Sequence, residues 1–221
     1  MKNFNINKNS TQYGRSMIEM LGVLAIVGVL SVGGIAGYSK AMEKFKINKT
    51  TDQISQIVTN IRTLYAQQTT YSGLNNENAI KMGVVPDELG SGATLTNSFG
   101  GNVYIIPSST TYEIQYGKVF AVQYRGLSKQ ACISLGTTDW GSSHSSGFVG
   151  IDIAQMSGEN QMTINLLQNN QCKGSNNGSL ITACSNKTAN ITTPLPVSTV
   201  ANLCSVCDNA GKDCQITIAY Q

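Results

Sequence analysis

The N-terminal part of the chain carries an unbroken apolar stretch. Residues Met20 to Ser39 contain no charged side chain, and most of them are Leu, Val, Ile, Ala or Gly. A helix of this length rises roughly 30 Å, the thickness of the hydrocarbon core of a bilayer. The stretch therefore predicts a membrane-spanning helix.

The hydrophobic pattern then changes, but the helix does not stop. Apolar side chains recur at spacings of three and four from Ile54 to Tyr65, with polar residues between them, which is typical of an amphipathic helix. No proline or glycine lies between the apolar stretch and Gly73. We therefore expect a single helix over about residues 17–69.

From Gly73 onward, turn-forming residues replace the helical periodicity and alternate with short apolar stretches. We expect an α+β head over residues 71–221. In front of it, we expect residues 17–39 to lie in a membrane and residues 40–70 to pack on the head. The elements expected in the head are helices over 77–82 and 127–135, the latter capped by Ser128, and strands over 103–106, 112–116, 118–124, 149–153, 162–167 and 215–220.

The cysteines indicate where the head resides. All six lie in a C-terminal region that is poor in charge and rich in Asn, Ser, Thr and Gly. An even number of cysteines confined to one part of a chain is typical of disulfides formed in an oxidising compartment, so we place the head outside the cytoplasm. The six residues allow fifteen pairings, among which spacing does not choose. They are Cys132, Cys172, Cys184, Cys204, Cys207 and Cys214.

The first fourteen residues are polar and basic, with Lys2 and Lys8 and no acid. This is the charge pattern of a leader, and its only glycine, Gly14, lets a protease approach the backbone closely. A conventional secretory cut near residues 39–41 is the alternative, but the helical pattern continues through it. Removing the leader lowers the formal charge from +3 to +1, which is too little to argue for nucleic-acid binding.

Gly14, Arg15 and Glu19 precede the apolar stretch at a characteristic spacing. A leader that ends in Gly, a Glu five residues later and an apolar helix resemble the class III signal of type IV prepilins. The resemblance implies a prepilin peptidase that cuts after Gly14, and methylation of the new N-terminus at Arg15, where the family usually has Phe, Met or Leu. It also implies a leader over 1–14 and a helix over 15–70 in an inner-membrane precursor. Pilus assembly machinery would then incorporate the subunit into an extracellular bacterial filament.

A second match narrows the family. Residues 83–86 and 95–103, which include Asn97-Ser-Phe-Gly-Gly101, resemble the αβ-loop and first strand of type IVb pilins. The resemblance implies the type IV pilin fold, in which a long N-terminal helix packs on an antiparallel sheet in a disulfide-bonded head. It further implies a homo-oligomeric helical filament, with host-cell or bacterial surface receptors as further partners.

Glu19 needs a physical explanation of its own. A carboxylate at the edge of the hydrocarbon costs on the order of 2 to 3 kcal/mol unless it is paired or reaches the interface. In a filament, the free amine of a neighbouring Arg15 would pair with Glu19 and set the axial register. Alternatively, Glu19 lies at the headgroup level and only suits the helix dipole. Similarly, Gly33 and Gly37 form a small-xxx-small pair for close helix approach, or they reflect ordinary glycine enrichment of membrane helices.

The resemblance also bears on the cysteines. Type IVb pilins join a cysteine in an early head helix to one near the C-terminus, which implies a bridge from Cys132 to Cys204 or Cys207. The further expected bridges join Cys172 to Cys184, and Cys214 to one member of the Cys204/Cys207 pair.

Other chemistry finds little support. Cys204-Ser-Val-Cys207 is compatible with a redox motif or half a zinc site, but a thioredoxin-like unit is not predicted and His144 is the only histidine. Residues 208–213 carry calcium-like oxygen ligands at a spacing that matches no standard loop, so a turn is favoured. The sequence predicts no catalytic residue, metal or cofactor, and hence no enzyme.

These patterns together favour the structural subunit of a type IVb pilus. One alternative keeps the architecture and makes the chain a minor pilin or a type II secretion pseudopilin. Another makes it a single-pass, membrane-anchored extracellular binding protein, whose helix only tethers a recognition head. The organism, the receptor, and the choice among adhesion, aggregation, conjugation and motility are not readable from the sequence.

Overall fold

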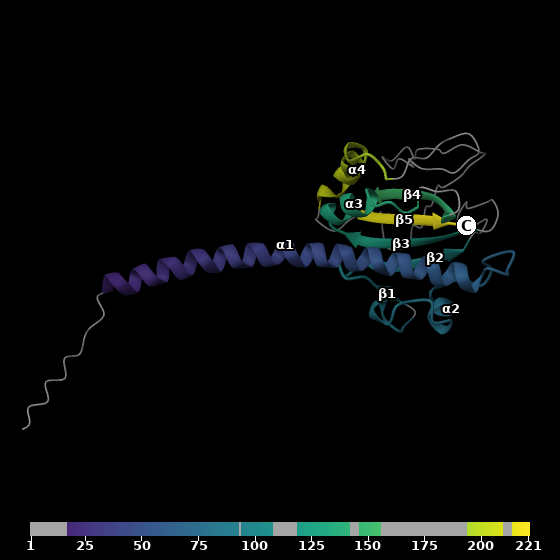
Figure 1. Ribbon diagram of the computed structural model, residues 1–221, viewed down its shortest axis with the longest axis horizontal. Helices are drawn as coiled ribbons and strands as arrows, with labels where there is room; N and C mark the ends of the chain where they lie inside the picture. Colours follow the sequence, from purple (N-terminus) through teal and green to yellow (C-terminus); the bar gives the residue numbers. More distant parts are fainter. Residues whose placement is uncertain (1–16, 93, 108–118, 142–145, 156–193, 210–213) are drawn as a thin grey trace, which may run out of the picture. The chain divides into compact units, whose positions relative to one another are not determined.

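The computed structural model describes residues 17–92, 94–107, 119–141, 146–155, 194–209 and 214–221 (Figure 1). The chain divides into two compact units, residues 1–43 and 44–221. Helix α1 (Met17–Leu64) supplies the described part of the first unit and the first helix of the second.

A five-stranded antiparallel sheet forms the centre of the second unit, with its strands in the order β1-β2-β3-β5-β4 (Figure 1). Every residue of β3 and β5, the strands that have a hydrogen-bonded neighbour on each side, is buried. The bounds are β1 (Leu95–Thr96), β2 (Asn102–Pro107), β3 (Phe120–Leu127), β4 (Phe148–Gln155) and β5 (Cys214–Tyr220).

One face of the sheet and the C-terminal part of α1 build the core. Ile54, Ile57 and Ile61 of α1 are fully buried in the same cluster as two rows of side chains that cross the sheet. The strand registers place Val103, Tyr124, Ile216 and Ile153 in one row, and Ile105, Val122, Ile218 and Ile151 in the other. Because the side chains of a strand alternate between its faces, this register sends a second, more polar set to the opposite face.

Short helices surround the sheet. They are α2 (Asn76–Lys81), the 3₁₀ helix η1 (Asp87–Leu89), α3 (Lys129–Gly136), α4 (Val197–Leu203) and the 3₁₀ helix η4 (Cys204–Asn209). The Oγ of Ser128 accepts a hydrogen bond from the backbone N–H of Ala131 at 3.1 Å. The predicted cap of α3 is therefore confirmed, and a side-chain oxygen satisfies one of the free N–H groups at the start of that helix.

Most expected elements of the head are present. The strands expected over 103–106, 118–124, 149–153 and 215–220 are confirmed as β2, β3, β4 and β5, and the two expected helices as α2 and α3. The strands expected over 112–116 and 162–167 lie outside the described residues. Helix α4 was not predicted, because its Val-Ser-Thr-Val sequence has low helix propensity. The burial of Val200 and Leu203 against the core stabilises it instead.

The prediction of the end of α1 was wrong by about one turn. The α-helix ends at Leu64 rather than near Thr69. Beyond it, the N–H groups of Ala66 and Gln68 each bond a carbonyl three residues back, which is the geometry of a tightened last turn. The ring of Tyr65 packs on that of Tyr71 at 5.2 Å, so a tertiary contact turns the chain where local periodicity would have continued the helix.

Candidate assembly site

The N-terminal part of α1 exposes apolar side chains on all sides. The large hydrophobic residues between Met17 and Tyr38 are 50% to 85% exposed. By length and composition, α1 is the one helix among the described residues that is able to cross a membrane. An apolar surface of this extent is unfavourable in water, so it indicates burial in lipid or against other chains.

The few polar groups of this segment suit an apolar environment. The hydroxyls of Ser31 and Ser39 donate hydrogen bonds to the carbonyls of Val27 and Ile35, at 2.7 and 3.0 Å, and so need no partner outside the helix. Glu19 is the only charged residue between positions 17 and 39, and it lies in the first turn of α1. Its carboxylate is thus the only strong acceptor that the segment offers to a neighbour.

Gly33 and Gly37 lie on α1 with open space beside them. A Cβ atom built at either position meets no atom within 4 Å. Packing within the described chain therefore does not require these glycines, and their backbone is accessible to another helix. The roles predicted for Glu19, Gly33 and Gly37 involve a second subunit, while Gly14 and Arg15 lie outside the described residues.

Two of the basic residues that follow the apolar segment contact the head. Lys46 Nζ lies 5.8 Å from the centre of the Phe99 ring, and Lys49 Nζ lies 2.8 Å from Glu88 Oε2 in η1. Hydrogen bonds from Lys49 and Gln53 lower the pKa of Glu88 from its ordinary value. These contacts hold η1 and the turn between β1 and β2 against the part of α1 that belongs to the second unit.

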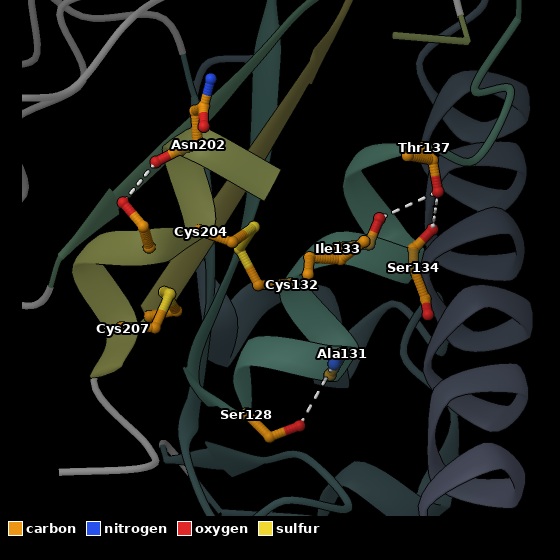
Figure 2. The surroundings of a disulfide bond; sticks show 11 residues. Ser128, Ala131, Cys132, Ile133, Ser134, Thr137, Asn202, Cys204 and Cys207 are labelled. Atoms are coloured by element: carbon orange, nitrogen blue, oxygen red, sulfur yellow. Dashed lines mark hydrogen bonds between the residues drawn. A yellow bond between two sulfur atoms is a disulfide. The ribbon is translucent and has the colours of Figure 1, made fainter. Parts of the chain in front are cut away.

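Two disulfides join the C-terminal elements of the head. Cys132 of α3 is bonded to Cys204 at the start of η4 (Figure 2), and Cys207 of η4 is bonded to Cys214 at the start of β5. The first is one of the two bridges that the resemblance allowed for Cys132. The second is one of the two expected for Cys214. Both expectations are confirmed.

Of the remaining cysteine predictions, one concerns described residues and the other lies outside them. Cys204 and Cys207 are bonded to different partners, so they do not form a Cys-x-x-Cys redox disulfide in this structure. Cys172 and Cys184, as well as His144, lie outside the described residues. The bridge between Cys172 and Cys184 stays a prediction.

The sequence of the head places it among known proteins. Residues 44–219 match the PilS family, in a region described as PilS N terminal. The chain belongs to the PilS family. It is a pilin, in agreement with the type IVb resemblance found in its signal and its αβ-loop.

Similar proteins are pilus subunits. This pilin is 30% identical over 152 residues to the major structural subunit of bundle-forming pilus of Escherichia coli O127:H6 (strain E2348/69 / EPEC). The aligned residues cover 68% of this chain and 74% of that protein. The subunit of the same name from Escherichia coli O111:H- matches with the same identity and coverage. Both relatives are named as structural subunits, which favours a structural over a catalytic role.

The solved structures that resemble the pilin include those of two other pilins. The type IVb pilin from Salmonella typhi has a TM-score of 0.44 and 17% identity, and covers 75% of this chain and 94% of its own. TcpA, a type IV pilin from the El Tor biotype of Vibrio cholerae, has a TM-score of 0.46 and 15% identity. The match covers 80% of this chain and 99% of TcpA.

The pilin's αβ-loop motif has a clear physical basis. Asn97 is buried, and its Oδ1 accepts hydrogen bonds from the N–H groups of Phe99 and Gly101, at 2.8 and 3.2 Å, while its Nδ2 donates to the carbonyl of Arg125 at 2.8 Å. A Cβ atom at Gly101 would lie only 1.8 Å from that carbonyl oxygen. The Asn-x-aromatic-Gly-Gly sequence therefore closes a turn directly against β3.

Sequence reasoning missed a polar row on the second face of the sheet. The registers place Tyr104, Gln123, Thr217 and Asp152 side by side across four strands. Gln123 Nε2 donates to Thr217 Oγ1 at 3.0 Å and Gln123 Oε1 accepts from Arg125 Nε at 2.9 Å, while the Arg125 guanidinium lies 4.6 Å from the Tyr104 ring centre. The signal that could have predicted this row is the presence of amide and charged residues, such as Gln123 and Asp152, inside otherwise apolar strands.

Asp152 is the outlier of this row. It is 4% exposed, and its Oδ1 has no hydrogen-bond partner among the described residues. Burial raises the pKa of Asp152 to about 6, although a backbone hydrogen bond from Ile153 acts in the opposite direction. A carboxyl group in this setting binds a proton more readily than it does in the unfolded chain.

Proposed function

We propose that the pilin is cut after Gly14 and polymerises through residues 17–39 of α1 to form the core of a type IVb pilus, with disulfide-bonded heads on its surface. The observation that supports this most directly is the apolar, exposed N-terminal part of α1, which carries a single charge at Glu19. In the precursor this segment would lie in the inner membrane, and in the filament it would pack against the same segment of other subunits.

In this proposal, Glu19 sets the axial register. A carboxylate surrounded by hydrocarbon is stabilised when it is paired with a cationic group. The free amine of Arg15 in a neighbouring subunit is that group, and it exists only after the prepilin peptidase has removed residues 1–14. Cleavage thus creates the partner that Glu19 needs. Methylation of this amine keeps its positive charge.

Exchanging Glu19 tests the register role. Glu19→Gln keeps the size of the side chain and removes its charge, whereas Glu19→Asp keeps the charge and shortens the side chain. We expect Glu19→Gln to abolish sheared surface filaments while the processed pilin accumulates in the membrane, and Glu19→Asp to retain a reduced yield. The readouts are immunoblots of sheared and membrane fractions, together with electron microscopy. Normal filaments from Glu19→Gln would refute the register role.

The alternatives predict different distributions. A minor pilin or pseudopilin would be a rare component of sheared filaments, whereas the two curated relatives are named as major subunits. A tethered binding protein would stay in the membrane fraction and would be indifferent to both Glu19 variants. Assembly machinery and host-cell or bacterial surface receptors are the further partners that this function requires or admits.

A further inference from the structure

Four of the cysteines meet where α3, η4 and β5 come together. The Sγ atoms of Cys132, Cys204 and Cys207 lie within 4.8 Å of one another, and all three side chains are fully buried. The first two are bonded to each other, while Cys207 is bonded to Cys214. A sulfur of one disulfide therefore lies beside both sulfurs of the other (Figure 2).

The geometry of η4 explains this arrangement. Side chains three positions apart eclipse each other in a 3₁₀ helix, and Cys204 and Cys207 are such a pair within η4. Both project from one side of η4, and α3 packs there with Cys132. The sulfur of Cys207 thus lies within 4.8 Å of Cys132 Sγ, which is already bonded to Cys204.

We propose that these three sulfurs form a thiol–disulfide exchange site, and that formation of the Cys207–Cys214 bridge stops the exchange. While Cys214 is unpaired, the Cys207 thiolate attacks Cys132 Sγ. The Cys132–Cys204 bond breaks, the Cys132–Cys207 bond forms, and Cys204 leaves as a thiolate. Attack by Cys204 reverses the step. One thiolate replaces another, so the exchange needs neither an oxidant nor a reductant.

Closing the second bridge ends the exchange. The thiols of Cys207 and Cys214 lose two protons and two electrons to a disulfide-bearing oxidant, which is reduced to two thiols. Cys207 is then no longer a nucleophile, and Cys132 keeps Cys204. The Cys207–Cys214 bridge spans 7 positions against 72 for Cys132–Cys204, so it constrains the unfolded chain less. Its main contribution is to remove the competing thiol.

Two matched variants test the proposal. Cys214→Ser and Cys207→Ser both remove the same bridge, but only the first leaves a thiol at position 207, beside the Cys132–Cys204 bond. Both are made in the full-length chain with Cys172→Ser and Cys184→Ser, purified in detergent, quenched in acid and alkylated. Tandem mass spectrometry then locates the label, which resolves Cys204 from Cys207 within one peptide.

For Cys214→Ser, we expect the label to be divided, with at least about a tenth on Cys204, and to redistribute faster at about pH 8 than at about pH 6 because the thiolate is the attacking species. For Cys207→Ser, we expect the label on Cys214 alone, with Cys132–Cys204 intact. Label on Cys207 alone in Cys214→Ser, at both pH values, would overturn the proposal.

If near-UV circular dichroism shows that Cys214→Ser is unfolded, a third variant tests the same exchange. In Cys204→Ser, Cys207 can form a disulfide with either Cys132 or Cys214. The proposal predicts label on both Cys214 and Cys132. Label on Cys132 alone would show that Cys207 does not reach it, and would reject the exchange site.

Discussion

At the scale of single residues, buried polar groups determine how the sheet is stabilised. Gln123, Thr217 and Arg125 satisfy one another in a hydrogen-bonded row, and a buried row of this kind is stable only when its members are paired. Asp152 lies in the same row of the register, and among the described residues it is the only buried acid. Its raised pKa is the consequence of this burial.

Asp152 makes the stability of the head depend on pH. Its pKa is about 6 in the folded chain against an ordinary 3.8, so the folded state holds the proton more tightly. The stability that this group contributes is complete below about pH 4 and is lost as the pH rises through about 6. We expect Asp152→Asn to stabilise the head at pH 7 by about 3 kcal/mol, and to leave stability almost unchanged at pH 4.

Thermal unfolding of the full-length pilin in detergent, followed by circular dichroism between pH 4 and pH 7.5, measures this effect. Asp152→Asn should flatten the dependence of Tm on pH. Parallel curves for the wild type and Asp152→Asn would contradict the assignment.

At the scale of elements, close approaches between helices fix the end of the head that carries the disulfides. A Cβ atom at Gly136, the last residue of α3, would lie 2.6 Å from Val200 Cγ1 in α4 and 2.9 Å from Ile153 Cδ1 in β4. Helix α4 therefore depends on a glycine more than sixty residues earlier in the chain. This dependence explains why local propensity did not predict it.

Gly136→Ala should destabilise the head by about 1 to 3 kcal/mol, because the new methyl group overlaps two packed side chains. Val200→Ala should cost a similar amount by leaving a cavity. The double variant should lose less than the sum of the two, since the smaller residue in α4 makes room for the larger one in α3. Urea unfolding of the three variants gives the coupling, and strict additivity would show that the contact is not the cause.

At the scale of the whole molecule, processing and oxidation leave a signature in the mass. We expect the pilin sheared from cells to begin at Arg15, and under non-reducing conditions to be lighter than the reduced chain by about 6 Da, because three disulfides remove six hydrogens. Two of these disulfides are present among the described residues. A difference of about 4 Da would leave Cys172 and Cys184 unpaired, and an uncut chain found only in membranes would favour a tethered protein.

The features that depend on local order were predictable from the residues alone: the apolar stretch with one acid at its start, the amphipathic continuation of the helix, the cap at Ser128 and four strands of the sheet. Local periodicity and capping chemistry are properties of neighbouring residues, so they are readable without a fold. The family signal and the αβ-loop motif were readable for the same reason, and the PilS match agrees with them.

Tertiary structure decided the rest. It chose Cys204 over Cys207 for Cys132, buried Asp152 beside a hydrogen-bonded row, ended α1 at Leu64 and formed α4 against Gly136. Each of these outcomes depends on residues that are distant in sequence and adjacent in space. Burial, packing overlap and disulfide partners are set by those long-range contacts, which local patterns do not encode.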